Sequence, residues 1–175
     1  AFSGTKITNV TVPEGISEIK SSTFEGCAYL EEVVIPGTVT LINASAFQNC
    51  TNLKNITIPN GVLSLAGYAF YGCTNLSILD LSNFDTHNVE TMWSMFRFCS
   101  ALKTIYVSEG WSTAKVTADR GINMFEYCKS ITSIEFGDNF DTSKVTSMGN
   151  MFSGCTNLYS ITFSETFNTS NVTSM

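Results

Sequence analysis

Charged residues are scarce in this sequence, and the few that occur are not gathered in one place. They make up 14% of the 175 residues, and fifteen acidic against nine basic side chains give a net charge of −6 at pH 7. Nucleic-acid-binding proteins carry a basic stripe or patch, and none is present here. An apolar run long enough to span a membrane is also missing, as are a signal peptide and a lipidation motif. We therefore expect neither nucleic acid as a partner nor insertion of this segment into a membrane.

Groups that perform catalysis are equally scarce. His87 is the single histidine, and although Asp85 lies close to it, no nucleophile has a matching base. No acid–base pair, metal-ligand cluster or phosphate-binding loop can be assembled, and no Cys-x-x-Cys motif suggests zinc. Asp85, Asp141 and Asn168 stand at equivalent positions and could bind calcium, yet Asp and Asn also cap turns through their own backbone, which is the interpretation we favour. The sequence thus predicts no enzyme, no catalytic residue, no metal and no cofactor.

What the chain does contain is a repeated motif of Phe, two residues, Cys, two residues, and Leu or Ile. All six cysteines fall in it, and its copies begin at Phe24, Phe47, Phe70, Phe96, Phe125 and Phe152, which are separated by 23, 23, 26, 29 and 27 residues. Such a period is typical of stacked supersecondary units. After each motif, aliphatic residues alternate with other residues, as in a short strand with one buried face. The sequence therefore predicts a solenoid rather than a globule with one central core.

Two repeat subtypes follow each other along the chain. Residues 1–81 hold the shorter repeats of 23 residues, in which a proline ends each predicted strand and an alanine precedes the later Phe anchors. Residues 82–175 hold longer repeats of 26–29 residues, whose linker reads Phe-Asp-Thr-Ser-Lys-Val-Thr-Ser-Met at residues 140–148 and similarly at 167–175. We treat 1–175 as a single solenoid. Because neither end carries the polar cap that solenoids need, we expect it to be a fragment of a longer protein.

The two subtypes resemble known repeats over essentially the whole chain. The shorter ones resemble the BspA-like leucine-rich repeat, with its Ile-Pro step and its Ala-Phe-x-x-Cys-x-x-Leu signature. The longer ones are similar to a related repeat typified by Phe-Asp-Thr-Ser-x-Val-Thr-Ser-Met-x-x-Met-Phe. The resemblance implies a leucine-rich-repeat-type, right-handed stack of about seven coils. Short parallel strands would form one face, and turns and short helical turns the other. It also implies an extracellular, cell-surface protein of bacteria or protists that mediates adhesion by binding host or matrix proteins.

The six cysteines suggest either disulfides or buried thiols. Each stands three residues after its Phe and should point inward with it, so that stacked coils form a column of cysteines about 4.8 Å apart. That spacing does not by itself exclude a bridge. Inward thiols at identical positions nevertheless behave as small hydrophobes. We therefore predict free, buried thiols, and we expect the methionines beside the Phe anchors to fill the core.

Two surfaces are candidates for partner binding. Residues between the buried aliphatics of the predicted strands should point outward, and the central ones form the first candidate: Asn55, Thr57, Ile78, Asp80, Thr104, Tyr106, Ser133 and Glu135. The second comprises Trp93, Phe98 and Tyr127. Phe98 and Tyr127 each stand two residues after a Phe anchor, where the other copies have Gly or Asn. Adjacent exposed aromatics suit an interaction site or a sugar platform, unless they cover the divergent segment 103–124.

Three functions remain open. The leading hypothesis is a cell-surface module that binds another protein with its strand face. A carbohydrate-binding module could instead use Trp93, Phe98, Tyr106 and Tyr127. The third possibility is a structural stalk that spaces other domains.

Overall fold

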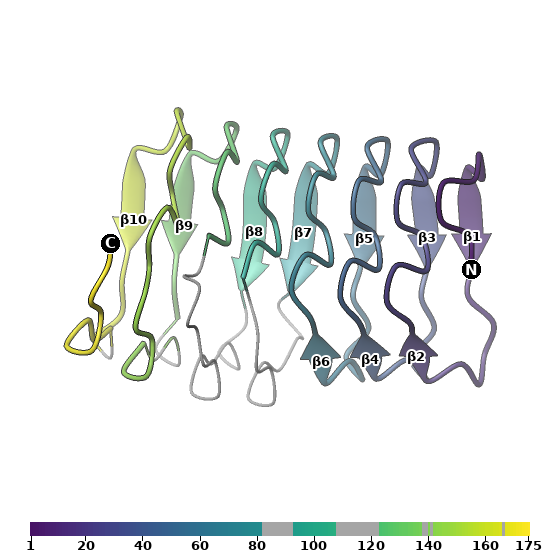
Figure 1. Ribbon diagram of the computed structural model, residues 1–175, viewed down its shortest axis with the longest axis horizontal. Coiled ribbons are helices and arrows are strands. Elements are labelled where there is room, and N and C mark those ends of the chain that lie inside the picture. Colours follow the sequence, from purple (N-terminus) through teal and green to yellow (C-terminus); the bar gives the residue numbers. More distant parts are fainter. Residues whose placement is uncertain (82–92, 108–122, 138–139, 141, 166) are drawn as a thin grey trace.

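The computed structural model describes residues 1–81, 93–107, 123–137, 140, 142–165 and 167–175, and within them it contains short strands and turns but no helix. One strand per coil lies in a single row along the long axis of the molecule (Figure 1). These strands are β1 (Asn9–Thr11), β3 (Glu32–Val34), β5 (Asn55–Thr57), β7 (Ile78–Leu81), β8 (Thr104–Val107), β9 (Ser133–Glu135) and β10 (Ser160–Thr162). The predicted solenoid of leucine-rich-repeat type, with parallel strands on one face, is thereby confirmed.

The row of strands pairs in strict register. β1, β3, β5, β7 and β8 form a five-stranded sheet in that order, and β9 and β10 form a separate two-stranded sheet. All pairs are parallel, and equivalent residues of successive coils face each other, as in Val33 opposite Ile56 and Ile56 opposite Leu79. Since side chains alternate between the two faces of a strand, the buried aliphatics form one column inside the solenoid. The residues on either side of them form two columns outside, here called the strand face.

A second sheet was not predicted from the sequence. It consists of β2 (Glu18–Ile19), β4 (Leu41–Ile42) and β6 (Ser64–Leu65), which pair in parallel at the lower edge of the first coils in Figure 1. Each strand sends one aliphatic side chain into the core: Ile19, Ile42 and Leu65 are all buried. Two residues are too few to produce a visible alternation, so these strands exist only because neighbouring coils stack in register.

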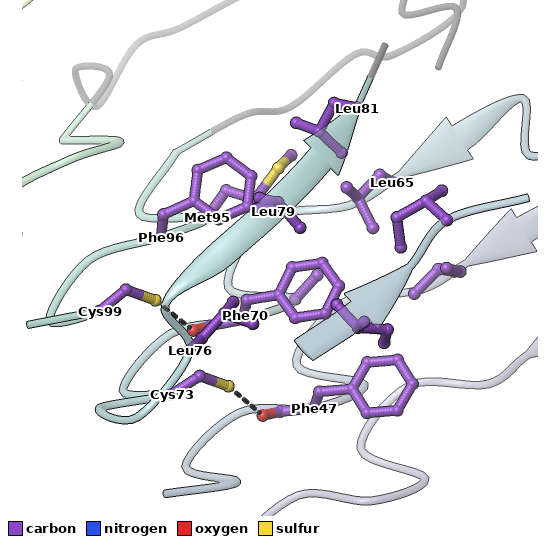
Figure 2. Packing of buried hydrophobic residues seen from close by; sticks show 14 of the residues in the cluster. Phe47, Leu65, Phe70, Cys73, Leu76, Leu79, Leu81, Met95, Phe96 and Cys99 are labelled. Carbon is purple, nitrogen blue, oxygen red and sulfur yellow. Dashed lines mark hydrogen bonds between the residues drawn. The ribbon is translucent and has the colours of Figure 1, made fainter. Parts of the chain in front are cut away.

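Phenylalanine rings form a continuous stack through the solenoid. Their centroid distances are 5.5 Å for Phe2–Phe24, 5.3 Å for Phe24–Phe47, 5.5 Å for Phe47–Phe70, 6.0 Å for Phe70–Phe96, 5.8 Å for Phe96–Phe125 and 6.1 Å for Phe125–Phe152. The interplanar angles stay within 18°. Figure 2 shows three of these rings with the leucines and Met95 that surround them. Offset stacking of this kind stabilises beyond the burial of area alone.

The cysteines are free, as predicted, and five of the six are buried, while Cys155 is half-buried. The prediction that these thiols act as small hydrophobes was incomplete. Each thiol also donates a hydrogen bond to the backbone carbonyl oxygen of the equivalent Phe in the preceding coil. Figure 2 shows this for Cys73 with Phe47 and for Cys99 with Phe70, both with a sulfur–oxygen distance of 3.1 Å. The column of thiols therefore links the coils by polar contacts as well as by packing.

Candidate partner-binding surfaces

Six residues of the first predicted surface lie on three neighbouring strands of the five-stranded sheet. One row across the sheet is Asn55, Ile78 and Thr104, and the other is Thr57, Asp80 and Tyr106. On β5 and β7 these residues are exposed, and Ile78 has 48% of its surface accessible. For Tyr106 the structure describes the backbone alone. β5 and β7 thus present their predicted side chains to solvent, on either side of the buried Ile56 or next to the buried Leu79.

The remaining two residues of that surface, Ser133 and Glu135, belong to the other sheet. Both are exposed on β9, on either side of the buried Ile134. β9 pairs with β10 and shares no ladder with β8 in the described part of the chain. The predicted surface is therefore divided between two sheets.

A hollow in the strand face lies closer to the N-terminus than the predicted centre. Its volume is about 600 Å³, and β1, β3 and β5 line it, together with Glu31, Ile35 and Lys54 next to those strands. Val34 in this hollow has 49% of its surface exposed. The surface predicted from the sequence shares only Asn55 and Thr57 of β5 with this hollow and otherwise extends over β7, β8 and β9. The signal that could have revealed the hollow is the run Glu31-Glu32-Val33-Val34, where two carboxylates adjoin an outward valine.

The charges in this hollow are unevenly paired. Lys54 Nζ lies 2.8 Å from Glu31 Oε2, and both side chains are largely exposed. The side chain of Glu32, the next residue, makes no hydrogen bond or ion pair with any described residue, and Glu32 lies in register between Asn9 and Asn55. The exposed Lys54–Glu31 pair adds little to stability. It does leave Glu32 as the uncompensated charge of the hollow.

The second predicted surface is part of a longer aromatic strip. The rings of Phe98 and Tyr127 stack with centroids 4.9 Å apart and planes 2° apart. Tyr71 meets Phe98 edge-on at 5.4 Å, and Tyr68 meets both Tyr71, at 5.5 Å, and Trp93, at 4.4 Å. The structure thus connects the three predicted residues through two tyrosines that the sequence analysis missed. Their signal was a Tyr two residues before and a Tyr one residue after the anchor Phe70.

Three members of the aromatic strip have an unusual backbone conformation. The φ angles of Tyr68, Phe98 and Tyr127 are 61°, 64° and 61°, in the left-handed region. At the positions of Phe98 and Tyr127, other coils carry Gly26 and Gly72 with φ of 69° and 71°. A bulky residue in this region is rare and costs about 1–3 kcal/mol, whereas glycine pays no steric penalty. The side chains of these residues must therefore contribute interactions that offset the strain.

Some of these interactions are within the molecule. A Cβ atom built on Gly154 would lie 2.4 Å from Cδ1 of Tyr127, so one face of the Tyr127 ring rests on the next coil. The opposite face stacks on Phe98. The guanidinium carbon of Arg97 lies 5.0 Å from the centroid of Phe98, within the range of a cation–π contact. Tyr127 thus has a neighbouring coil on each side of its ring, yet 37% of its surface remains exposed.

An ion pair joins the two coils that carry Phe98 and Tyr127, between the residues that precede these aromatics in the sequence. Arg97 Nε lies 2.8 Å from Glu126 Oε2, and Arg97 Nη2 donates to Glu126 Oε1 at 3.1 Å. The Glu126 side chain is only 8% exposed, whereas that of Arg97 is 29% exposed, so the pair is shielded from water on the glutamate side. Removing one partner would leave a buried charge uncompensated, which costs far more than the pair itself contributes. Arg97 and Glu126 therefore hold the coils of Phe98 and Tyr127 at their spacing.

Several other predicted positions fall partly or wholly outside the described residues. His87, Asp85 and Asp141 lie outside the residues that the structure describes. Asn168 is described, and its Oδ1 accepts a hydrogen bond of 2.8 Å from the backbone N–H of Ser170, which is the turn-capping role favoured above. The described part of the chain contains no group of three or more His, Cys, Asp or Glu side chains that could hold a metal ion. Nor does any helix long and apolar enough to cross a bilayer occur in those residues.

Comparison with known proteins places these features in a family. Residues 1–118 match the model of the BspA-type leucine-rich repeat region in six copies, and residues 122–175 match a family described as a Mycoplasma protein of unknown function. No curated protein matches the chain.

Solved structures show the same fold. A leucine-rich repeat protein of Treponema pallidum (T. pallidum) is 22% identical with a TM-score of 0.72, and the alignment covers 91% of this chain and 69% of that one. A leucine-rich repeat protein from Eubacterium ventriosum is 23% identical with a TM-score of 0.59, and the alignment covers 91% of this chain but 49% of that one. At these identities the likeness concerns the fold alone. The match of the repeat model over residues 1–118 shows that the chain belongs to the BspA-type leucine-rich repeat family.

Proposed function

We propose that this chain is a non-catalytic interaction module of a cell surface, which binds another protein, such as a host or extracellular-matrix protein, through its strand face. The observation that carries the proposal is the register of the five-stranded sheet, in which every pair joins equivalent residues of successive coils. Each coil therefore presents two outward side chains at fixed positions. These can differ from coil to coil without disturbing the buried columns, which is how solenoids build extended binding surfaces.

The chemistry of the strand face supports a protein partner. Val34 and Ile78 are about half exposed, with polar residues such as Asn55 and Thr57 on the strand between them. Protein interfaces combine a few apolar anchors with a polar rim, and the anchors contribute most of the binding free energy. Membership in a leucine-rich repeat family favours the same class of function.

The two alternatives receive less support. Sugar binding on aromatic platforms needs an accessible ring face, and the stacking of Tyr127 on Phe98 and its closeness to Gly154 reduce the face that a sugar could use. A structural stalk makes no use of outward side chains on the strand face, so it gives no reason for Val34 and Ile78 both to be about half exposed there. Both alternatives are outcomes of the experiment below.

The experiment measures binding of the purified chain to a panel of immobilised extracellular-matrix proteins and to a glycan array. For a matrix protein that binds, the double variant Ile78→Ala with Asp80→Ala should lose at least about tenfold in affinity, because it truncates both outward side chains of β7. The matched control is Leu41→Ala with Leu63→Ala, which removes exposed apolar side chains (38% and 48% exposed) near the second sheet.

Three results would contradict the proposal. Binding to glycans alone would favour the carbohydrate module. Equal affinity of the β7 variant and the control would place recognition away from the centre of the strand face. No binding to any protein or glycan of the panel would favour the stalk. Unchanged far-ultraviolet circular dichroism of both variants ensures that the comparison concerns the surface and not the fold.

A further inference from the structure

The hollow over β1, β3 and β5 contains one carboxylate without a counter-charge. The Glu31 carboxylate pairs with Lys54 at 2.8 Å, whereas the side chain of Glu32 makes no hydrogen bond or ion pair with any described residue. In the sheet register Glu32 has Asn9 on one side and Asn55 on the other. Neither neighbour carries a charge, and the other charged side chains of the lining, Glu31 and Lys54, are paired with each other, so Glu32 gives the hollow its net negative charge.

A cover over this hollow must satisfy that charge. A carboxylate that loses its water without gaining a partner of opposite charge is strongly destabilised. An acidic or purely apolar partner would therefore be disfavoured, and a cationic group would be favoured. The net charge of −6 on the whole chain attracts cationic partners over longer distances as well.

The hollow also offers an apolar contact at a fitting distance. Val34 follows Glu32 by two residues on the same strand and is 49% exposed. Residues two apart in a strand point to the same face and lie about 6.6 Å apart. This is close to the reach of a lysine or arginine side chain from its Cα to its charged head, and its methylene groups pack on apolar surface while the head stays polar.

We propose that the hollow receives a lysine or arginine side chain of the protein partner. The charged head donates hydrogen bonds to the carboxylate of Glu32, and the stem lies over Val34. This inference rests on the proposed function, since it names the chemistry by which the strand face would recognise its partner. A free metal cation is a poorer occupant, because the described residues provide no cluster of three ligands at any point.

The test uses two capped peptides as probes: acetyl-Lys-Val-Lys-Val-Lys-amide and its counterpart with Glu in place of each Lys. Each is titrated into the isotope-labelled chain, and backbone amide shifts are followed by NMR. The lysine peptide should shift amides of β1, β3 and β5 in preference to other strands, and the glutamate peptide should not. Raising the salt concentration should weaken the effect, because partly exposed charges are screened.

Variants decide whether Glu32 is responsible. Glu32→Gln keeps the size of the side chain and removes its charge, and it should weaken binding of the lysine peptide at least fivefold. Glu165→Gln is the matched control, since it removes an equally exposed carboxylate in the last coil, and it should leave the affinity unchanged. Equal loss in both variants, or shifts spread over all exposed carboxylates, would mean unspecific attraction and overturn the inference.

The two proposals fail in different ways. If the lysine peptide ignores the hollow while the β7 variant still loses its matrix protein, the strand face binds proteins but not through Glu32. If the lysine peptide binds at Glu32 while the β7 variant binds its matrix protein normally, the hollow takes cationic side chains although the centre of the proposed surface is wrong.

Discussion

The shorter and the longer repeats close the same coil with different side chains. In the shorter ones, the strands β2, β4 and β6 supply Ile19, Ile42 and Leu65 to the core. In the described part of the longer ones, phenylalanine pairs stack two and six residues after the strand centre, where the shorter repeats have aliphatics such as Ile35 and Val39: Phe136 with Phe140 at 4.2 Å, and Phe163 with Phe167 at 4.1 Å. The strand columns and the Phe–Cys–Leu frame are common to both. The frame therefore determines the solenoid, while the linker needs only to fill its interior.

The position before each anchor Phe shows the same exchange at a single site. Ala46 and Ala69 occupy it in the shorter repeats, and Met95, Met124 and Met151 occupy it in the longer ones, all of them buried. The ring distances grow in parallel, from 5.3–5.5 Å between the shorter repeats to 5.8–6.1 Å beyond them. A larger side chain beside the stack takes more room, so the wider spacing is the physical consequence of methionine in place of alanine.

The largest expected effect tests whether the Phe stack contributes equally to stability in the shorter and the longer repeats. Phe47→Ala should lower the free energy of unfolding by about 3–5 kcal/mol, because the ring is completely buried between two others. Phe152→Ala should cost clearly less, since that ring is half-buried. Urea denaturation of both variants measures the difference. A loss below about 1 kcal/mol for Phe47→Ala would mean that the stack is not the core of the fold.

The next effect tests the exchange of alanine and methionine. Met95→Ala should destabilise by about 2–5 kcal/mol, because it leaves a cavity beside a packed ring stack. Ala69→Met should cost about 1–3 kcal/mol, because the narrower stack has no room for the longer side chain. The same denaturation experiment applies. If the chain tolerates Ala69→Met without loss, the ring spacing does not depend on this residue.

The thiols allow a comparison without mutation. Burial, reinforced by the neighbouring thiol of Cys27, raises the pKa of Cys50 to about 12, and burial raises the pKa of Cys73 and Cys99 well above its ordinary value. These thiols should resist alkylation between pH 7 and 9, while the half-buried Cys155 labels first. Mass spectrometry of the native chain gives the order of labelling. Mass losses of two daltons per cysteine pair would instead reveal disulfides and contradict the free thiols.

The raised thiol pKa values also link stability to pH. The pKa of a cysteine in the unfolded chain is about 8.5. Folded Cys50 still keeps its proton at that pH, because its pKa is raised to about 12. The contribution of Cys50 to stability is therefore complete below about pH 8.5 and decreases as the pH rises toward its folded pKa of about 12. The urea concentration at the midpoint of denaturation should accordingly decrease as the pH is raised from about 8.5 to about 10. The decrease should be larger for the natural chain than for a Cys50→Ala variant.

The smallest effect concerns the aromatic strip. Phe98→Gly relieves a left-handed backbone conformation and removes the ring contacts with Tyr127 and Tyr71. The relief is about 1–3 kcal/mol and the two ring contacts together contribute about as much, so the stability should change by less than about 2 kcal/mol. A loss above about 2 kcal/mol would show that Phe98 serves mainly to cover its neighbours. Unchanged stability with weaker binding to a matrix protein would make the strip a second interaction surface.

Much of the fold was predictable because its determinants repeat. The Phe, Cys and Leu positions recur in frame, and the alternation around Val33, Ile56 and Leu79 predicts both the strands and the side that is buried. Of the first surface, the predicted outward residues of β5 and β7 are indeed exposed. The hollow at Glu32 was missed, because the depth of a sheet face depends on the side chains of three coils together and on no single motif.

By itself, the sequence determined the repeat frame, the parallel strand column and the inward thiols, because each follows from a periodicity that local geometry converts into one face. The tertiary structure alone decided the second sheet, the bonds from each thiol to the preceding coil, and the contacts that join Tyr68 and Tyr71 to Phe98. These depend on how closely neighbouring coils approach and on backbone angles at single residues. Neither quantity is encoded in the spacing of residues along one coil.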